Sequence, residues 1–242
     1  MPFTSHLSEL RSRLLKSVLA IAVAFVACFA VADEIFAVLA APLRRLHIEG
    51  LMLIGTAVAE AFFTKMKVSF VAALMLSSPV LFWQLWQFIA PGLYEHEKRY
   101  TRSFVLFGSL FFAAGAVFCY WVVVQEGLEF LLTRYEAIHI QPLLQVADYL
   151  SLVSRLVLAF GIMFELPVLA FFLARAGVID HRLLIRHSRY ALLGIALFAA
   201  ILTPPDLISQ LFLMLPLAIL YGVSIAVAYA ARLRMNRIEE GE

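Results

Sequence analysis

The run Val68–Leu93, VSFVAALMLSSPVLFWQLWQFIAPGL, contains 26 residues and no charged side chain. A helix needs roughly 20 apolar residues to cross the roughly 30 Å of hydrocarbon in a bilayer. The apolar residues here are continuous and do not alternate with period two, which favours a helix over a strand of a membrane barrel. The run therefore predicts a transmembrane helix, and it sets the fold class of the chain.

The rest of the sequence has the same character. It is 63% hydrophobic and only 15% charged, whereas a soluble domain carries about 25% charged residues. Including the run above, we predict six spans. The other five are Ser17–Ala32, Ser103–Val124, Leu156–Ala174, Tyr190–Leu202 and Leu207–Ala231. The expected fold is an all-α integral membrane protein, a single six-helix domain over residues 1–242.

Two features of this arrangement stand out. Tyr190–Leu202 would cover only about 20 Å, which is too short to cross an ordinary bilayer upright without thinning it. The segments at roughly 33–67 and 125–155 are too apolar to be disordered, and we expect short helices packed at the outer interface.

The charges at the ends of the spans predict the orientation. The side that holds both termini carries 13 of the 19 Lys and Arg residues, and the other side carries six. Cytoplasmic loops are the ones enriched in these residues. We therefore expect a multi-pass protein of the cytoplasmic (inner) membrane with both termini in the cytoplasm, where residues 232–242 form a tail.

Residues 1–16 have the pattern of an amphipathic helix on the cytoplasmic surface. The apolar positions, spaced by four, three and four, are Phe3, Leu7, Leu10 and Leu14. Glu9 lies four residues before Arg13, so one interpretation is a local ion pair. The alternative is that Glu9 is kept free to meet a partner.

The loop FIAPGLYEHEKRY, residues 88–100, carries Glu95 and Glu97 beside Lys98 and Arg99. These charges can neutralise one another in a solvated loop. The functional alternative is a site for a cationic peptide, because a carboxylate accepts two parallel hydrogen bonds from a guanidinium group. At an effective dielectric near 20, unit charges about 4 Å apart attract by roughly 4 kcal/mol.

The same loop contains residues that could shape such a site. Phe88 and Tyr94 would supply apolar walls, and Pro91 with Gly92 would fix the turn. These residue types suit binding and not catalysis.

Glu165 lies in the middle of a predicted span. A charged side chain there costs about 2.5–3.5 kcal/mol, so an intramembrane acid is a candidate functional residue. A structural, hydrogen-bonded carboxylic acid beside Pro167 is the alternative.

Asp206, after Pro204 and Pro205, is well placed to cap the last helix. Gln210 follows it, and helix packing alone could explain it.

Other kinds of chemistry find no support in the sequence. The motifs G-x-S-x-G, Walker A and H-E-x-x-H do not occur, the six histidines have no metal-ligand spacing, and no basic cluster with interleaved aromatics occurs. Both cysteines lie inside apolar runs, where a buried thiol behaves as a small hydrophobe. We expect no enzymatic activity and no cofactor.

Five motifs, in the same order over the six spans, resemble the TatC family of twin-arginine protein translocases. They are His6–Leu14, Ala41–Leu43, Phe88–Glu97, Phe164–Val168, and Thr203–Asp206 with Ser209 and Gln210. The resemblance implies a glove-shaped bundle that acts as a receptor for folded proteins whose signal peptides bear two consecutive arginines. Transport by this family is driven by the proton-motive force.

The resemblance also implies roles for individual residues. Glu97 and Glu9 would meet the arginine pair, with Glu95 as a secondary candidate. Glu165 would line the concave face. The residues that shape the peptide site would be Leu10, Arg13, Phe88 and Pro91, and those that support the outer caps and contacts with single-span TatA- and TatB-type subunits would be Pro42, Asp206 and Gln210. Other copies of the chain and membrane lipid would be further partners.

One position departs from the family pattern. Tyr221-Gly222 stands where family members often carry an acid after the aromatic residue of the last span.

Two other functions stay open. One is a proton-coupled small-solute transporter that uses Glu165 as its relay. However, the predicted second, third and fifth spans contain no ionisable relay residue. The other is a purely structural assembly scaffold.

Overall fold

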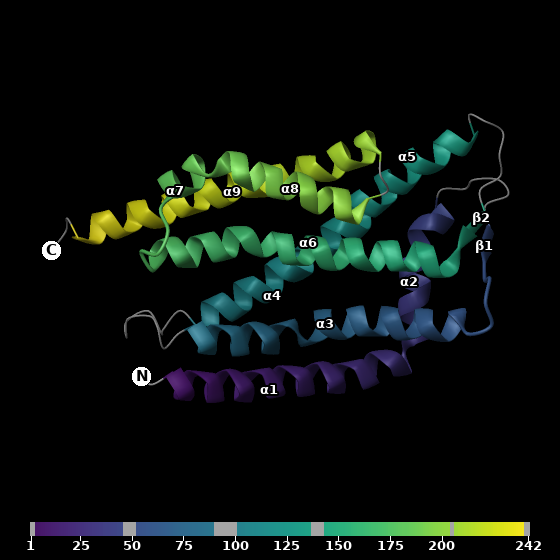
Figure 1. Ribbon diagram of the computed structural model, residues 1–242, viewed down its shortest axis with the longest axis horizontal. Helices are drawn as coiled ribbons and strands as arrows, with labels where there is room; N and C mark the ends of the chain where they lie inside the picture. Colours follow the sequence, from purple (N-terminus) through teal and green to yellow (C-terminus); the bar gives the residue numbers. More distant parts are fainter. Residues whose placement is uncertain (1–2, 46–51, 90–100, 137–142, 204–205, 240–242) are drawn as a thin grey trace.

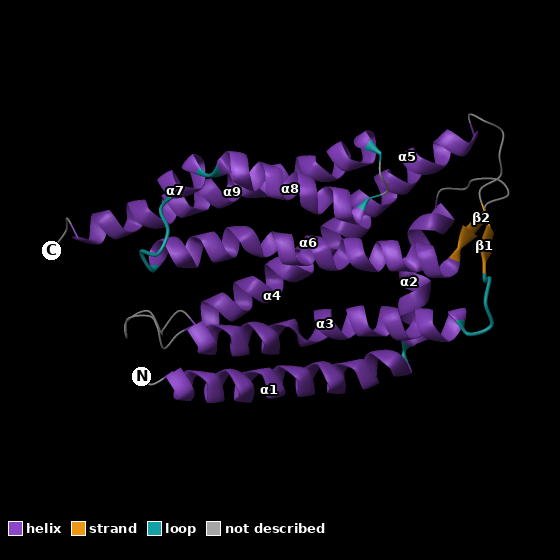
Figure 2. Cartoon of the chain, viewed as in Figure 1, coloured by secondary structure: helices purple, strands orange, loops and turns teal. Residues whose placement is uncertain are grey.

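The computed structural model describes residues 3–45, 52–89, 101–136, 143–203 and 206–239. This part of the chain is almost entirely helical, with one pair of very short strands (Figure 2). The elements in chain order are α1 (Phe3–Ala30), α2 (Ala32–Arg45), β1 (Met52–Ile54), α3 (Glu60–Ile89), α4 (Thr101–Phe118), the π-helix η3 (Cys119–Val123), α5 (Val124–Glu136), β2 (Leu143–Gln145), α6 (Val146–Arg175), α7 (His181–Arg186), α8 (Ser188–Leu202) and α9 (Leu207–Glu239).

Five of the described helices are long and apolar enough to cross a membrane: α1, α3, the continuous run of α4, η3 and α5, α6, and α9. The short α8 is apolar as well, and its 15 residues cover about 22 Å. The helical membrane-protein class is confirmed. Several helices are longer than the apolar runs predicted, because α3 and α6 begin before the charged residues Lys67 and Arg155.

The predicted helix of residues 1–16 is present from Phe3 onward, and its place on the membrane surface stays a prediction. Residues 3–16 are the first turns of α1, which continues without a break to Ala30. Helix α1 runs alongside α3 in the bundle (Figure 1). Buried Ala24 and Cys28 contact Ala73 of α3. Small residues let two helix backbones approach closely in a membrane.

The molecule has two distinct ends. The short elements α2, β1 and β2 lie at one end, which we call the cap end (Figure 1). The first turn of α1 and the last turn of α9 lie at the other, which we call the terminal end. At the cap end β1 and β2 pair in parallel, with Leu53 opposite Leu144. These strands were not predicted, and the expected short helices of this region account only for α2 and α5.

Pro42 lies inside α2 and is buried. A proline has no backbone N–H, so it leaves the carbonyl group four residues earlier without its helical donor. That carbonyl belongs to Val38, and the hydroxyl of Tyr120 donates to it at 2.6 Å. The next carbonyl, of Leu39, accepts from the hydroxyl of Tyr149 at 2.9 Å. Two tyrosines therefore attach the cap helix to the bundle.

The centre of the bundle depends on glycines where α4 meets α6. A Cβ atom at Gly115 would lie 2.6 Å from the carbonyl oxygen of Phe160. One at Gly161 would lie 2.9 Å from the ring of Phe112. Only glycine permits this approach of the two backbones. The largest core cluster lies around this crossing, and Phe160 within it is fully buried.

Candidate functional site

At the terminal end, the start of α1 is joined to the end of α3 by Arg13. Its guanidinium group donates to Glu9 Oε1 at 3.1 Å and, through the other terminal nitrogen, to Gln87 Oε1. Gln84 lies at the limit of the same interaction, at 3.5 Å. The side chains of Arg13 and Glu9 are 23% and 29% exposed. The local ion pair predicted for Glu9 is therefore present, and it is attached to α3.

Gln87 is positioned two residues before the end of α3, and residues 90–100 follow. Pro91, Glu95 and Glu97 lie outside the described residues, so their predicted roles stay predictions. Phe88 is half-buried in the last turn of α3. Leu10, one residue after Glu9, is 43% exposed and offers an apolar surface next to the ion pair.

Glu165 of α6 is buried, with 6% of its surface exposed. Its Oε2 atom would lie 3.3 Å from a Cβ atom at Gly108 of α4, and Phe82 of α3 packs against the same glycine. Neither carboxyl oxygen has a hydrogen-bond partner among the described residues. The backbone of Phe112 approaches the carboxyl group without reaching hydrogen-bonding geometry. Glu165 thus faces protein, and its two interpretations, as a functional acid or as a structural one, stay predictions.

The turn between α8 and α9 is held by its polar residues. Asp206 Oδ2 accepts from the backbone N–H of Ser209 at 2.7 Å, so the predicted cap of the last helix is confirmed. Gln210 donates from Nε2 to the carbonyl of Ala196 in α8 at 3.0 Å. This bond explains Gln210 by helix packing. The loop residues 204–205 lie outside the described part of the chain.

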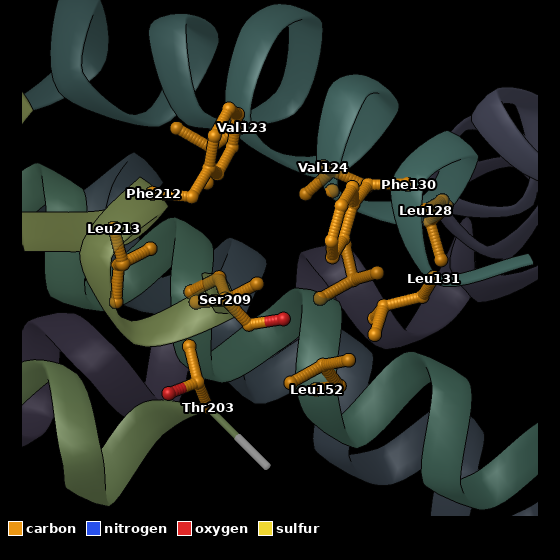
Figure 3. A pocket seen from close by; sticks show the side chains of 13 residues that line it. Val123, Val124, Leu128, Phe130, Leu131, Leu152, Thr203, Ser209, Phe212 and Leu213 are labelled. Carbon is orange, nitrogen blue, oxygen red and sulfur yellow. The ribbon is translucent and has the colours of Figure 1, made fainter. Parts of the chain in front are cut away.

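An apolar cavity of about 50 Å³ lies beneath this turn, between η3, α5, α6 and the start of α9 (Figure 3). Thr203 and Ser209 contribute its hydroxyl groups, and Thr203 already donates to Ala199. The cavity therefore offers little polar chemistry. Outside the cavity, α8 and α9 expose large apolar side chains. Four of them have 64–77% of their surface exposed: Leu193, Leu197, Ile201 and Leu207.

Sequence reasoning missed Glu60, the first residue of α3. Its Oε2 atom accepts from the backbone N–H groups of Thr56 at 2.5 Å and Ala57 at 3.1 Å, and from the Thr56 hydroxyl at 3.0 Å. Its Oε1 atom accepts from the backbone N–H of Ala147 in α6 at 2.9 Å. The available signal was an acid directly before the long helical run, in the sequence Gly-Thr-Ala-Val-Ala-Glu, where a first-turn carboxylate is favoured.

Comparisons with known proteins extend this picture. A family model described as "Sec-independent protein translocase protein (TatC)" matches residues 5–216. Proteins of that name from Campylobacter jejuni and Helicobacter pylori strain J99 are 47% and 44% identical to this chain over 223 residues, which is 92% of this chain and 91% and 87% of theirs. A crystal structure of a protein described as the twin-arginine translocase receptor TatC superimposes with a TM-score of 0.85 at 36% identity, over 93% of this chain and 99% of that one.

Proposed function

Because this chain belongs to the TatC family of Sec-independent protein translocase proteins, we propose that it is the subunit that binds twin-arginine signal peptides. It would bind folded precursor proteins through these peptides, nucleate assembly of the translocase, and work by binding and not by catalysis. The proton-motive force would drive transport, without nucleotide hydrolysis.

The proposal rests on the connection from Glu9 through Arg13 to Gln87. It places an acid of α1 at the end of α3, directly before residues 90–100. Glu97 would meet the arginine pair of the peptide from that loop, together with Glu9 and, secondarily, Glu95. A carboxylate can hold a guanidinium group by two parallel bonds, and Glu9 already accepts one bond from Arg13 through its Oε1 atom.

Neighbouring residues would complete the peptide site. The exposed side chain of Leu10 offers an apolar contact for the peptide next to Glu9. Phe88, in the last turn of α3, would contribute a wall, and Pro91 would aim the loop. Arg13 would act as the positioning residue, because it fixes the Glu9 carboxylate without leaving it fully exposed.

We further propose that the terminal end faces the cytoplasm of the inner membrane. The side with the termini carries 13 of the 19 Lys and Arg residues, and cytoplasmic loops have this bias. In that orientation the acids of the peptide site meet precursors before export. The cap end would then face outward, with Pro42 supporting it through its place in α2.

The exposed apolar faces of α8 and α9 suit contact with single-span TatA- and TatB-type subunits, and other copies of the chain could meet the exposed face of α1. Asp206 and Gln210 would support the first contact by fixing the turn between these helices. Glu165 would serve transport from its buried position against α4, and Pro167 follows it two residues later in the chain. A small-solute transporter is not supported, because the relatives are protein translocase proteins.

The proposal is tested by measuring the affinity of the purified full-length protein for a signal peptide with two arginines and for the same peptide with two lysines. Hydrogen bonds to charged groups contribute about 1.5–3 kcal/mol, so Glu97→Gln should weaken binding of the arginine peptide by roughly 10- to 100-fold. Glu9→Gln should weaken it by less, because Arg13 already occupies one of its oxygens.

Glu126→Gln is the matched control, because Glu126 is exposed in α5, which lies away from the terminal end (Figure 1). It should leave the affinity unchanged. Equal affinity for the two peptides, together with full binding by Glu97→Gln, would contradict the receptor function. Cross-linking from position 97 to the arginine region of the peptide gives an independent check.

A further inference from the structure

Two cationic side chains meet at one serine on the face between α3 and α6. The ammonium group of Lys67 lies 3.5 Å from the hydroxyl oxygen of Ser151. The guanidinium group of Arg155 donates from Nε to the backbone carbonyl of the same serine at 3.3 Å. Both cationic side chains are exposed, and Ser151 is half-buried.

Neither cation has an acidic partner in the described part of the chain. The acids nearest in sequence do not serve as one. Glu60, two turns before Lys67, uses both oxygens for Thr56, Ala57 and Ala147. Asp148 is exposed in the first turn of α6 and forms no ion pair with either cation. By contrast, Lys65 is paired with Asp33.

The two cations lie inside helices that are long enough to cross a membrane. Each helix has 30 residues and spans about 45 Å, which matches a bilayer with its headgroup layers. Lys67 and Arg155 are about 10 Å and 14 Å from the starts of their helices. In a bilayer centred on these helices, their Cα atoms would lie just below the headgroup boundary, and Arg155 reaches back toward the cap end through its bond to Ser151.

An apolar track continues below the cations. Ser151, Arg155, Leu158 and Ile162 are spaced by four, three and four residues, so they share one face of α6. Ile162 is 60% exposed. On α3, Phe70 lies one turn below Lys67 and is 47% exposed. The surface thus combines two positive charges near the headgroup boundary, which have no acidic partner among the described residues, with exposed apolar side chains toward the bilayer centre.

We propose that Lys67 and Arg155 form a seat for the phosphate group of an anionic phospholipid in the cap-side leaflet. The acyl chains of this lipid lie along Leu158 and Ile162. A phospholipid fits both parts of the surface at once, because its phosphate lies at the depth of the cations and its chains lie at the depth of the apolar track. The described residues supply neither cation with an anionic partner, and cations near the membrane surface attract anionic lipid headgroups.

The test is native mass spectrometry of the purified full-length protein titrated with phosphatidylglycerol, or with phosphatidylcholine of the same chain lengths. A cation near an anionic lipid surface contributes about fivefold in affinity. The variant Lys67→Gln/Arg155→Gln should therefore bind phosphatidylglycerol about 30-fold more weakly. Phosphatidylcholine should bind weakly to the wild-type chain and the variant alike.

Two further variants separate charge from fold. Lys67→Arg/Arg155→Lys keeps both charges and should keep the wild-type affinity. Arg182→Gln/Arg186→Gln removes two exposed charges from α7 and should also leave the affinity unchanged. Together they test whether the effect belongs to this pair of cations.

Several results would overturn the lipid seat. One is equal affinity of Lys67→Gln/Arg155→Gln and the wild-type chain for phosphatidylglycerol. Another is displacement of the lipid by millimolar inorganic phosphate, which would show a site for a free anion. A third is loss of single-span subunits from the purified complex of that variant without loss of lipid, which would assign the cations to an acidic residue of a partner.

Discussion

The Glu60 carboxylate accepts a hydrogen bond from the backbone N–H of Ala147 at 2.9 Å, although the two residues are 87 positions apart. This bond joins the first turn of α3 to the first turn of α6, which start together at the cap end and run in the same direction (Figure 1). The other carboxylate oxygen holds Thr56 and Ala57, just after β1. One side chain therefore fixes two helix starts and the strand that precedes them.

Removal of this carboxylate should loosen the cap end. Glu60→Ala leaves the backbone donors of Thr56, Ala57 and Ala147 without their acceptor, so the thermal unfolding midpoint in detergent should fall. Glu60→Gln keeps one carbonyl acceptor and should give an intermediate midpoint. Glu126→Ala, at an exposed position of α5, is the control. Equal midpoints for all three variants would show that the clamp contributes nothing.

The glycines between α4 and α6 give a graded series. Gly115→Ala sets a Cβ atom against the backbone oxygen of Phe160, which cannot move alone, so we expect a loss of about 1–3 kcal/mol in unfolding free energy. Gly161→Ala meets only the ring of Phe112 and should cost less. Gly127→Ala meets no atom within 4 Å and should gain up to about 1 kcal/mol from helix propensity. Denaturant titration in mixed micelles measures the order, and a loss at Gly127 equal to that at Gly115 would contradict it.

Hydropathy was sufficient to locate the long apolar helices of this fold, because continuous apolar runs have few other uses in a chain of this length. It placed their ends less well. Lys67 and Arg155 interrupt the apolar runs, but the backbone stays helical through them, so α3 and α6 begin earlier than expected. The strands β1 and β2 have three residues each, and their pairing is nonlocal, so no sequence periodicity could indicate them.

The candidate site could be predicted only in part. The spacing of Glu9 and Arg13 predicted their ion pair, because residues four apart face each other on a helix. The attachment of that pair to Gln87 depends on how α1 packs against α3, which no local pattern contains. The geometry of Glu165 against Gly108 is tertiary for the same reason.

Asp180 ties the connection between α6 and α7 to the end of α9, through ion pairs with Arg232 and, at 2.6 Å, with His181. Desolvation raises the pKa of Asp180, but hydrogen bonds from Arg232 and the backbone of Arg182, together with the charges of Arg232 and His181, outweigh it. The pKa therefore lies below its usual value of 3.8.

A lowered pKa stabilises the fold above the unfolded value of 3.8, and this stabilisation is lost as the pH falls through the folded value. Asp180→Asn should therefore lower the unfolding midpoint at about pH 5, and the gap to the wild-type chain should close as the pH falls below the usual pKa of the acid. Thermal unfolding of both proteins across this range measures the gap. A gap that widens toward acid pH would show the opposite sign.

The bond between Arg13 and Gln87 should matter for peptide binding without forming part of the peptide contact. Gln87→Leu removes the main acceptor, so Arg13 keeps only the 3.5 Å contact with Gln84 as its attachment to α3. A hydrogen bond contributes about 0.5–1.5 kcal/mol, or roughly 2- to 12-fold in affinity for the arginine signal peptide. Gln125→Leu in α5 is the control. If Gln87→Leu binds the peptide as tightly as the wild-type chain, Arg13 does not position Glu9.

Glu165 and Gln210 predict opposite effects of the same kind of substitution. Glu165 is buried without a hydrogen-bond partner in the described structure, whereas Gln210 donates to Ala196. A buried polar group without a partner costs about 1–3 kcal/mol, so Glu165→Leu should stabilise the protein by about that amount. Gln210→Leu should destabilise it, because the bond between α8 and α9 is lost. If Glu165 serves transport, as proposed above, Glu165→Leu should raise the unfolding midpoint while it lowers transport of a precursor into membrane vesicles. A variant that is both less stable and fully active in transport would place Glu165 among the structural residues of the bundle.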